Sequence, residues 1–368
     1  MENNYKKLDQ YLREYRSDID RIDLKILDLI NQRLILGKKI GQIKEKKQTD
    51  VFDSSREKQV ISKILKNNKG PAQEQLLKYI FNVIMTATRD IQKKQIVSFP
   101  GPEAGFCHMA ALNHFKYSGR FVEQLNIYEV FRNTNRKKSH FGVVPVETFM
   151  QDSMNHTLDL FVEFDLSILA EHYEPVSYDL ISLTGEKNNI KRIYTTAETF
   201  SQCKIWITNN FPNAKLIDTP NFSEAAELIA KKKDSAMISY AHASSIYSLH
   251  IVEPAIEDYP GTYNRFLIIG KDNLPRTGKD KTTIMFSTPN IPGALFKALE
   301  PVKNAGINML KLESRPSKHE NLSYYFFMDI EGHIQDQNLE KSMEKMRGLT
   351  LSLKHLGSYP VHEIQGAE

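Results

Sequence analysis

The sequence contains little that would indicate a secreted, membrane-bound or disulfide-linked protein. Its 368 residues include only two cysteines, Cys107 and Cys203, which give no disulfide framework and no spacing that suits a metal site. No apolar run approaches the length of a membrane span. The first ten residues, MENNYKKLDQ, lack the apolar core of a signal peptide. We therefore expect a cytoplasmic protein with no membrane partner.

A strong charge of one sign is also missing. The formal net charge is +4. The lysine-rich stretch 38–47 contains an acidic residue as well, and the stretch 231–233 is brief. Such runs are typical of a solvated face, so we expect no nucleic-acid partner. A small anionic substrate fits this charge at least as well.

Length and patterning predict a multidomain protein built from three segments. Residues 1–95 are predicted to be all-α. In residues 96–273 short β-type runs alternate with helical stretches, which is typical of an α/β domain. After a linker at 271–280, residues 274–368 follow a βαββαβ order, a ferredoxin-like α+β unit. The runs expected to be strands of the α/β segment are IVSFPGP, NIYEV, FGVVPVE, LSILAEHY, KIWIT, SAMISY and RFLIIG.

The first helix is predicted to run from about Asn4 to Lys47, with a second helix beginning near Asp53 and a third ending near Lys94. At 1.5 Å per residue the first helix would be roughly 65 Å long, too long to bury its apolar stripe within so small a domain. A second copy of the chain is the simplest partner, so we expect a homodimer or a larger homo-oligomer. The stripe consists of Ile19, Ile22, Ile26, Leu29, Leu36, Ile40 and Ile43.

Arg33 interrupts this stripe, and a buried guanidinium needs an anion. One interpretation is a polar residue that sets the register of a dimer through a carboxylate of the second copy. The other is a pocket for a small molecule with several carboxylates, because further cations accompany Arg33 on the helical segment. These are Arg16, Lys44 and Arg56, the last followed by Glu57.

These residues resemble the helical chorismate mutase family over residues 5–94. The resemblance implies rearrangement of chorismate to prephenate in a helical dimer, with Arg16 reaching into the partner's site. A pericyclic reaction needs no nucleophile, only a held conformer and stabilisation of the charge that develops on the ether oxygen. Lys44 and Gln92 would face that oxygen. The matching positions are Arg16, Arg33, Lys44, Asp53, Arg56, Glu57, Thr88 (where the family usually has serine) and Gln92.

The last segment resembles the ACT domains of phenylalanine-sensitive enzymes. The resemblance implies an effector site for an aromatic amino acid, phenylalanine or an analogue. A helix N-terminus beside an exposed strand end is the alternative reading of the same residues. The matching positions are Gly293, Ala294 and Leu295, then Asn308, and then Glu313, Ser314, Arg315 and Pro316.

The middle segment resembles prephenate dehydratase, a two-lobed fold with its site in the cleft between lobes and with no cofactor. The three-domain order is that of the chorismate mutase–prephenate dehydratases. The family's T-R-F element is Asn264-Arg265-Phe266 here, and its E-N-S/T element is Glu147-Thr148-Phe149. Its G-S/T-Y-S/T run is Ala104 to Cys107. Further positions of the implied prephenate site are Gly101, His108 and Ser153.

The change at Asn264 matters because dehydration requires a donor that protonates the leaving hydroxyl. An amide can hydrogen-bond to that hydroxyl but does not readily give up a proton. We therefore predict a mutase joined to a prephenate decarboxylase that keeps the ring hydroxyl, as in the non-aromatising relatives of the dehydratases. Arg265 would hold a carboxylate of prephenate, and His108 and Glu147 are candidates for the ring-proton donor. The alternatives are a conventional dehydratase and a middle domain that only binds prephenate.

Cys107 stands next to His108, but neighbours on one element usually point apart. We expect a packed thiol rather than a nucleophile.

Overall fold

A computed structural model of the chain describes residues 2–46, 54–92, 95–116, 119–147, 156–272, 274–316 and 324–362. The chain separates into two compact units, residues 1–95 and residues 96–368. Each is described by itself below.

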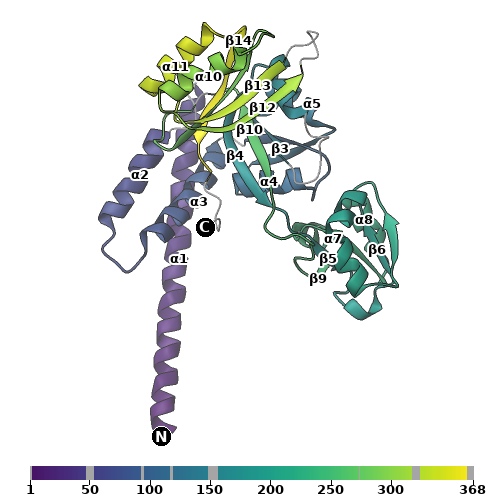
Figure 1. Ribbon diagram of the computed structural model, residues 1–368. Helices are drawn as coiled ribbons and strands as arrows, with labels where there is room; N and C mark the ends of the chain where they lie inside the picture. The colour runs from purple at the N-terminus through teal and green to yellow at the C-terminus, as the bar shows by residue number, and fades with distance from the viewer. Residues whose placement is uncertain are drawn as a thin grey trace. The chain divides into compact units, whose positions relative to one another are not determined.

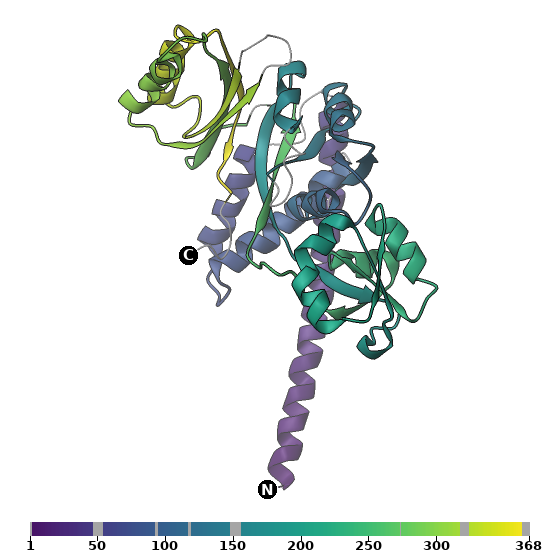
Figure 2. The ribbon, with the colours of Figure 1, turned by 45° about the vertical axis from the view of Figure 1, so that its right-hand side comes forward.

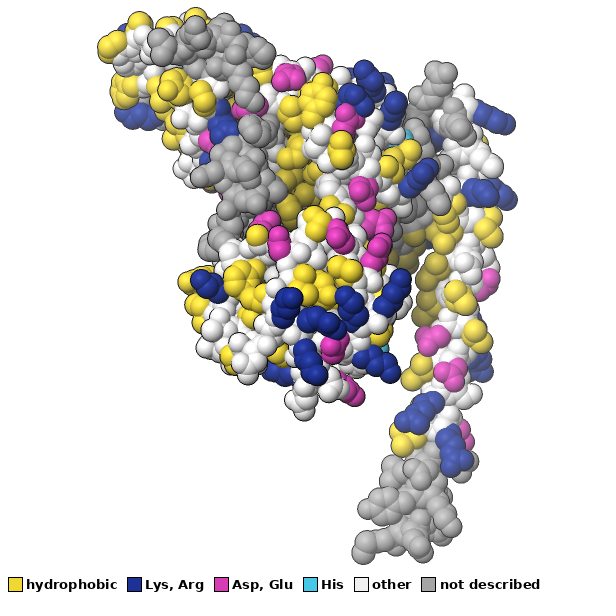
Figure 3. Space-filling model, turned by 90° about the vertical axis from the view of Figure 1, so that its right-hand side faces the viewer, with side chains coloured by type: hydrophobic (Ala, Val, Ile, Leu, Met, Phe, Trp, Pro, Cys, Tyr) yellow, Lys and Arg dark blue, Asp and Glu magenta, His cyan; other side chains and the backbone are white. Residues whose placement is uncertain are grey.

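The first unit consists of three helices, α1 (Glu2–Lys46), α2 (Ser54–Asn67) and α3 (Glu74–Gln92) (Figure 1). Their number and order confirm the prediction. Helix α3 packs against both α1 and α2. The predicted apolar stripe of α1 remains exposed in the single chain, as the yellow side chains along this helix in Figure 3 show. None of the described helices combines the length and apolar character needed to cross a bilayer.

The second unit begins with a lobe whose five-stranded sheet has the order β2-β1-β3-β10-β4. Strands β1, β2 and β3 are parallel, and β10 runs antiparallel to both β3 and β4. Helix α4 (Phe106–Phe115) packs on one face through Cys107 and Ala110. The other elements are β1 (Ile96–Pro100), β2 (Arg120–Gln124), α5 (Ile127–Asn135), β3 (Phe141–Glu147), α6 (His156–Glu163), β4 (Ser167–Pro175) and β10 (Tyr263–Gly270).

A second lobe is inserted between β4 and β10, so these two strands form the connection between the lobes (Figure 1). Its sheet has the order β7-β6-β8-β5-β9 and its own apolar core. The elements are β5 (Asp179–Ser182), a 3-10 turn (Lys187–Asn189), β6 (Arg192–Thr195), α7 (Ala197–Asn210), β7 (Lys215–Asp218), α8 (Phe222–Ile229), β8 (Ser235–Ser239), α9 (His242–Tyr247) and β9 (His250–Glu253).

Two of the expected strands are helices. The run NIYEV forms the start of α5, where the Asn126 side chain accepts a hydrogen bond from the backbone N–H of Glu129 and caps the helix. The run KIWIT lies inside α7, which Thr196 caps in the same way through Thr199. Short apolar runs do not distinguish a strand from a buried helix, and the polar cap residues ahead of these runs decided the outcome.

The last part of this unit has the predicted βαββαβ order, with an antiparallel sheet β12-β13-β11-β14. Helices α10 and α11 pack on one face of this sheet (Figure 2). Its other face contributes Met285, Phe327 and Tyr359 to a core shared with the first lobe. The elements are β11 (Asp280–Ser287), α10 (Ala294–Asn304), β12 (Met309–Pro316), β13 (Tyr324–Glu331), α11 (Gln337–Arg347) and β14 (Ser352–Pro360).

The shared core leaves no room at Gly357 of β14. A Cβ atom there would lie 2.1 Å from the backbone oxygen of Ile168 in β4, and backbone cannot move aside cheaply. We predict that Gly357→Ala lowers the free energy of unfolding by about 1–3 kcal/mol, the range typical of overpacking. Thermal and urea denaturation measure this. Gly348→Ala is the matched control, because its Cβ would meet Lys345 at an ordinary 3.5 Å. Equal stability of the two variants would contradict the prediction.

Candidate functional sites

In the helical unit, Arg33 of α1 and Thr88 of α3 are brought together. The Arg33 guanidinium donates to the hydroxyl of Thr88 and, at 3.3 Å, to the backbone oxygen of Ile84. Thr88 in turn donates to the same oxygen at 2.7 Å. The contact joins two of the residues predicted for the mutase site, which lie on different helices and 55 positions apart in sequence.

Two of the other predicted mutase residues are described. Arg16 is exposed and Lys44 is half-buried in the single chain. Asp53 and the side chains of Arg56, Glu57 and Gln92 lie outside the described residues, so the predictions for them stay predictions.

In the second unit, strand β10 presents consecutive residues to opposite faces of its sheet, as every strand does. Asn264 pairs with Glu174 of β4, and Phe266 pairs with His172. Phe266 packs against Cys107 and Ala110 of α4, so Asn264 lies on the face that α4 covers. Asn264 is buried, and it is the second residue of β10 after the chain returns from the inserted lobe.

A polar cluster that we did not predict lies on this face next to Asn264. The Glu174 carboxylate accepts a hydrogen bond from Asn113 of α4 at 2.7 Å and contacts Nε2 of His172 at 2.8 Å. The His172 ring lies 5.7 Å from that of His114. The sequence signal was the polar run EHYE, which begins inside the predicted strand LSILAEHY and ends one residue beyond it.

His108 and Cys107 are both buried in α4. Nδ1 of His108 accepts a hydrogen bond from the backbone N–H of Ala104, and its ring stacks on Phe99. Burial lowers the pKa of His108, so the ring is neutral near pH 7. Burial also raises the pKa of the Cys107 thiol well above its ordinary value. Cys107 is thus a packed thiol, as expected, and not an activated nucleophile.

Two further predicted residues already have protein partners. The backbone N–H of Gly101 donates to the oxygen of Gln124, so this amide is engaged within the fold. Burial alone would raise the pKa of Glu147, but hydrogen bonds from Lys311 and Arg265 outweigh it and hold the pKa below its usual range. An ionised carboxylate is a poor proton donor, and the contacts of Glu147 therefore disfavour that role. Thr148 and Ser153 lie outside the described residues.

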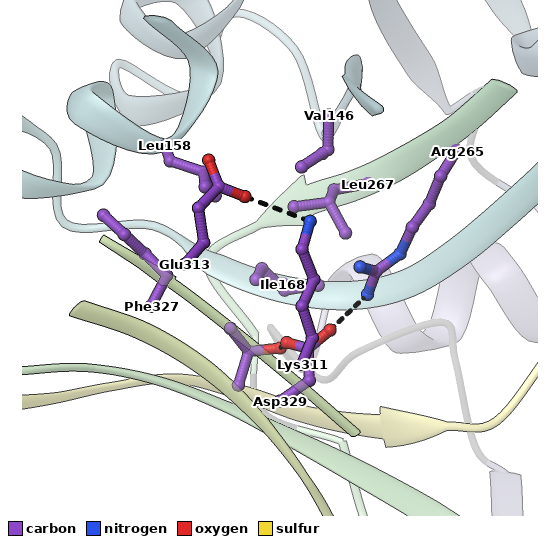
Figure 4. A pocket seen from close by; sticks show the side chains of 10 residues that line it. Val146, Leu158, Ile168, Arg265, Leu267, Lys311, Glu313, Phe327 and Asp329 are labelled. Atoms are coloured by element: carbon purple, nitrogen blue, oxygen red, sulfur yellow. Dashed lines mark hydrogen bonds and ion pairs between the residues drawn. The ribbon is translucent and has the colours of Figure 1, made fainter. Parts of the chain in front are cut away.

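Arg265 lies on the opposite face from Asn264 and contacts three carboxylates, of which Figure 4 draws Asp329. Its Nη1 contacts Glu147 at 2.8 Å, and its Nη2 contacts Glu171 at 2.9 Å and Asp329 at 2.7 Å. Burial would lower the pKa of Arg265, but the surrounding acidic groups, Asp329 foremost, hold it above the ordinary value. The prediction that Arg265 holds prephenate stays a prediction, and these contacts favour a structural role.

The predicted effector residues divide between two places. Gly293, Ala294 and Leu295 line a cavity of about 220 Å³ together with Tyr324 and Phe326. Glu313 and Arg315 instead lie on the face of β12 turned toward the first lobe. Arg315 contacts Asp159 of α6 at 3.5 Å, and Glu313 contacts Lys311 at 3.0 Å. Ser314 is exposed, and Asn308 donates to Glu331 at 3.1 Å.

Among the described side chains, no group of three or more His, Cys, Asp or Glu residues could hold a metal ion.

Comparison with known proteins accounts for all three parts of the chain. The family model for chorismate mutase type II matches residues 15–93, that for prephenate dehydratase matches residues 97–274, and that for the ACT domain matches residues 282–348. A bifunctional chorismate mutase/prephenate dehydratase of Aquifex aeolicus is 37% identical over 96% of this chain and 99% of its own. The chain belongs to this bifunctional family.

Further relatives agree. A bifunctional chorismate mutase/prephenate dehydratase of Stutzerimonas stutzeri is 35% identical over 95% of this chain and 97% of its own. The crystal structure of the prephenate dehydratase of Arthrobacter aurescens in complex with L-Phe superimposes with a TM-score of 0.65 and 25% identity. It covers 72% of this chain and 90% of that one. The predicted family and multidomain fold are thereby confirmed.

The histidines beside Glu174 give the second unit a predicted acid sensitivity. Burial, with His172 and His362 nearby, lowers the pKa of His114 to about 3 from an ordinary 6.5. A group whose pKa is lower in the folded state stabilises the fold above its unfolded pKa, and that stability is lost as pH falls from 6.5 toward 3. Between pH 7 and pH 5 the free energy of unfolding of the wild type should fall. We predict that the fall is smaller in His114→Gln, by up to about 2 kcal/mol. Urea denaturation at both pH values measures it, with exposed His250→Gln as control, and parallel pH profiles would contradict it.

Proposed function

We propose that the helical unit rearranges chorismate to prephenate and that the middle part then decarboxylates prephenate without expelling the ring hydroxyl. The observation that carries the second step is Asn264, which stands where the family's T-R-F element has threonine. Its side chain lies on the buried face covered by α4. An amide there can hold the substrate hydroxyl but is poorly suited to protonate it.

The proposed reaction balances without an added reagent. The ring carboxylate leaves as carbon dioxide, and its bonding electrons enter the adjacent diene. A ring carbon then takes up a proton, so the product is a non-aromatic dihydro-hydroxyphenylpyruvate. In the dehydratase reaction the same electrons expel the hydroxyl, which requires a proton on that oxygen instead. The two outcomes therefore differ in where the enzyme delivers one proton.

Glu174 is our candidate for the group that delivers this proton. It pairs directly with Asn264 across β10 and β4, and Asn113 and His172 orient its carboxylate. We prefer Glu174 to the earlier candidate Glu147, because the Glu147 carboxylate is held by Arg265 and Lys311. The N-terminus of α4, where Gly105 provides no side-chain cap, is suited to bind a prephenate carboxylate.

A conventional dehydratase is the second candidate, because the curated relatives are named prephenate dehydratases. Glu174 could in that case protonate the hydroxyl in place of a threonine-based donor. A middle domain that binds prephenate without turnover is the third.

We further propose a homodimer formed through α1 and an effector site for phenylalanine in the ACT part. The exposed stripe of α1, with Ile22 and Leu29 more than half exposed in the single chain, supports the first proposal. The cavity at Gly293 supports the second, as does the L-Phe complex of the Arthrobacter aurescens relative.

Product analysis tests the proposed second step. We predict that the wild-type protein converts chorismate to the dihydro-hydroxyphenylpyruvate, as followed by proton NMR. Asn264→Thr should restore a hydroxyl at this position and shift part of the product to aromatic phenylpyruvate. If phenylpyruvate is the sole product of the wild type, the middle part is a conventional dehydratase and the decarboxylase proposal is wrong. If prephenate accumulates, the middle part binds prephenate without converting it.

The role of Glu174 is tested by Glu174→Gln, which keeps the shape but removes the acid. We predict about 10²-fold slower consumption of prephenate, within the range for loss of a general acid. Disappearance of chorismate should continue at the wild-type rate, because that reaction belongs to the helical unit. Glu253→Gln in the inserted lobe is the matched control, since Glu253 is an exposed partner of Lys187. Unchanged prephenate turnover in Glu174→Gln would eliminate this carboxyl as the donor.

A further inference from the structure

The charged cluster around Arg265 joins two parts of the second unit. Glu147 and Glu171 come from β3 and β4 of the first lobe, whereas Asp329 comes from β13 of the ACT sheet. Asp329 also accepts a hydrogen bond from Thr283 of β11 at 2.6 Å. The guanidinium is thus held from both sides, and its position depends on the ACT sheet as much as on its own strand.

Lys311 of β12 makes a second connection. Its ammonium contacts Glu147 at 2.7 Å and Glu313 at 3.0 Å (Figure 4 draws the second contact). Glu147 therefore accepts from Lys311 of the ACT sheet and from Arg265 of β10 at the same oxygen. Strand β12 supplies Lys311 and Glu313 to this cluster, β13 supplies Asp329, and β11 supplies Lys281, which contacts Glu171 at 2.8 Å.

The residues held in this way adjoin the residues proposed to bind prephenate. Arg265 immediately follows Asn264, and Glu147 immediately precedes Thr148. Arg265 and Asn264 are consecutive on β10 and point to opposite faces, so a shift of the β10 backbone caused by a change in the contacts of Arg265 would also move Asn264.

The cavity at Gly293 lies on the opposite face of the same ACT strands. Phe326 lines this cavity, whereas the next residue, Phe327, and Asp329 face the first lobe. Phe326 pairs with Ser314 of β12, and Phe327 pairs with Glu313. A ligand that moves Phe326 therefore acts on the two strands that carry Asp329 and Lys311.

We propose that Lys311 and Asp329 are positioning residues that set the geometry of the prephenate site through Glu147 and Arg265, and that the effector acts by shifting these two contacts. The inference rests on the proposed function for the identity of the substrate. Allosteric coupling requires that the effector favour one of two arrangements, and here the arrangements differ in whether β12 and β13 hold the two lobe residues.

Lys311→Met is the most informative variant, because it removes the charge but keeps a long apolar side chain. The Lys311 side chain is 31% exposed and that of Glu147 is 44% exposed, so water can reach the carboxylate that loses its lysine partner. We expect kcat/KM for prephenate to fall about tenfold, with chorismate disappearance unchanged. Lys311→Arg should retain most of the wild-type kcat/KM for prephenate, because a guanidinium can donate to both Glu147 and Glu313. Asp329→Asn should act in the same direction as Lys311→Met.

Regulation and positioning are measured separately in the full-length protein. Calorimetry should show that phenylalanine binds Lys311→Met within twofold of the wild-type Kd, while its effect on prephenate turnover falls by at least half. Amide hydrogen exchange of residues 261–270 should be faster in Lys311→Met than in the wild type, with or without phenylalanine. Lys187→Met, which breaks the exposed pair with Glu253, is the matched control.

The outcomes separate the two proposals. A wild-type protein that leaves prephenate unchanged would overturn the proposed function, and amide exchange would still decide whether Lys311 positions β10. Wild-type kinetics together with wild-type exchange in Lys311→Met would overturn the positioning role. A full response to phenylalanine in a variant with altered kinetics would overturn the regulatory part.

Discussion

The second unit depends on a buried charge cluster in which Arg265 and Lys281 are the buried cations, Lys281 contacting Glu171 at 2.8 Å. A guanidinium removed from water is tolerated only with anionic partners, and Arg265 obtains three from three strands. Loss of any one partner would leave a charge imbalance in the interior, so β3, β4, β10 and β13 are constrained to keep their relative positions. The apolar core shared by the first lobe and the ACT sheet surrounds the same place. Together they explain why these two parts form one compact unit.

The period of two along β10 then makes consecutive residues serve different sites. Arg265 contacts the ACT sheet, and Asn264 lies beneath α4 beside Glu174. The regulatory part and the proposed prephenate site meet at one strand, because β10 of the first lobe contacts the ACT sheet through Arg265 and carries Asn264 on its other face. Strand β13 repeats the arrangement, with Phe326 at the effector cavity and Phe327 toward the lobe. Alternation along two strands is thus sufficient to connect a pocket on one face of the ACT sheet with Asn264.

Local patterns predicted much of this fold. The stripe of α1 and the βαββαβ order were read correctly because each depends on spacing within one segment. NIYEV and KIWIT were wrong because a five-residue apolar run fits a strand and a helix equally well. The partners of Arg265 could not be predicted, since Glu171 and Asp329 lie 94 and 64 positions away in sequence. The contact between Glu174 and Asn113 spans 61 positions and was missed for the same reason.

The proposed chemical outcome rests on the partners that the carboxylates have on the two faces of β10. On the ACT face every carboxylate described here is paired with a cation, as the lowered pKa of Glu147 reflects, and such groups do not donate protons near pH 7. On the α4 face Glu174 has an amide and an imidazole as partners instead. The proposed donor Glu174 thus lies on the same face of β10 as Asn264, away from the guanidinium of Arg265. In the proposed reaction the amide of Asn264 holds the hydroxyl and the carboxyl of Glu174 serves the ring carbon, and this arrangement would favour decarboxylation over dehydration.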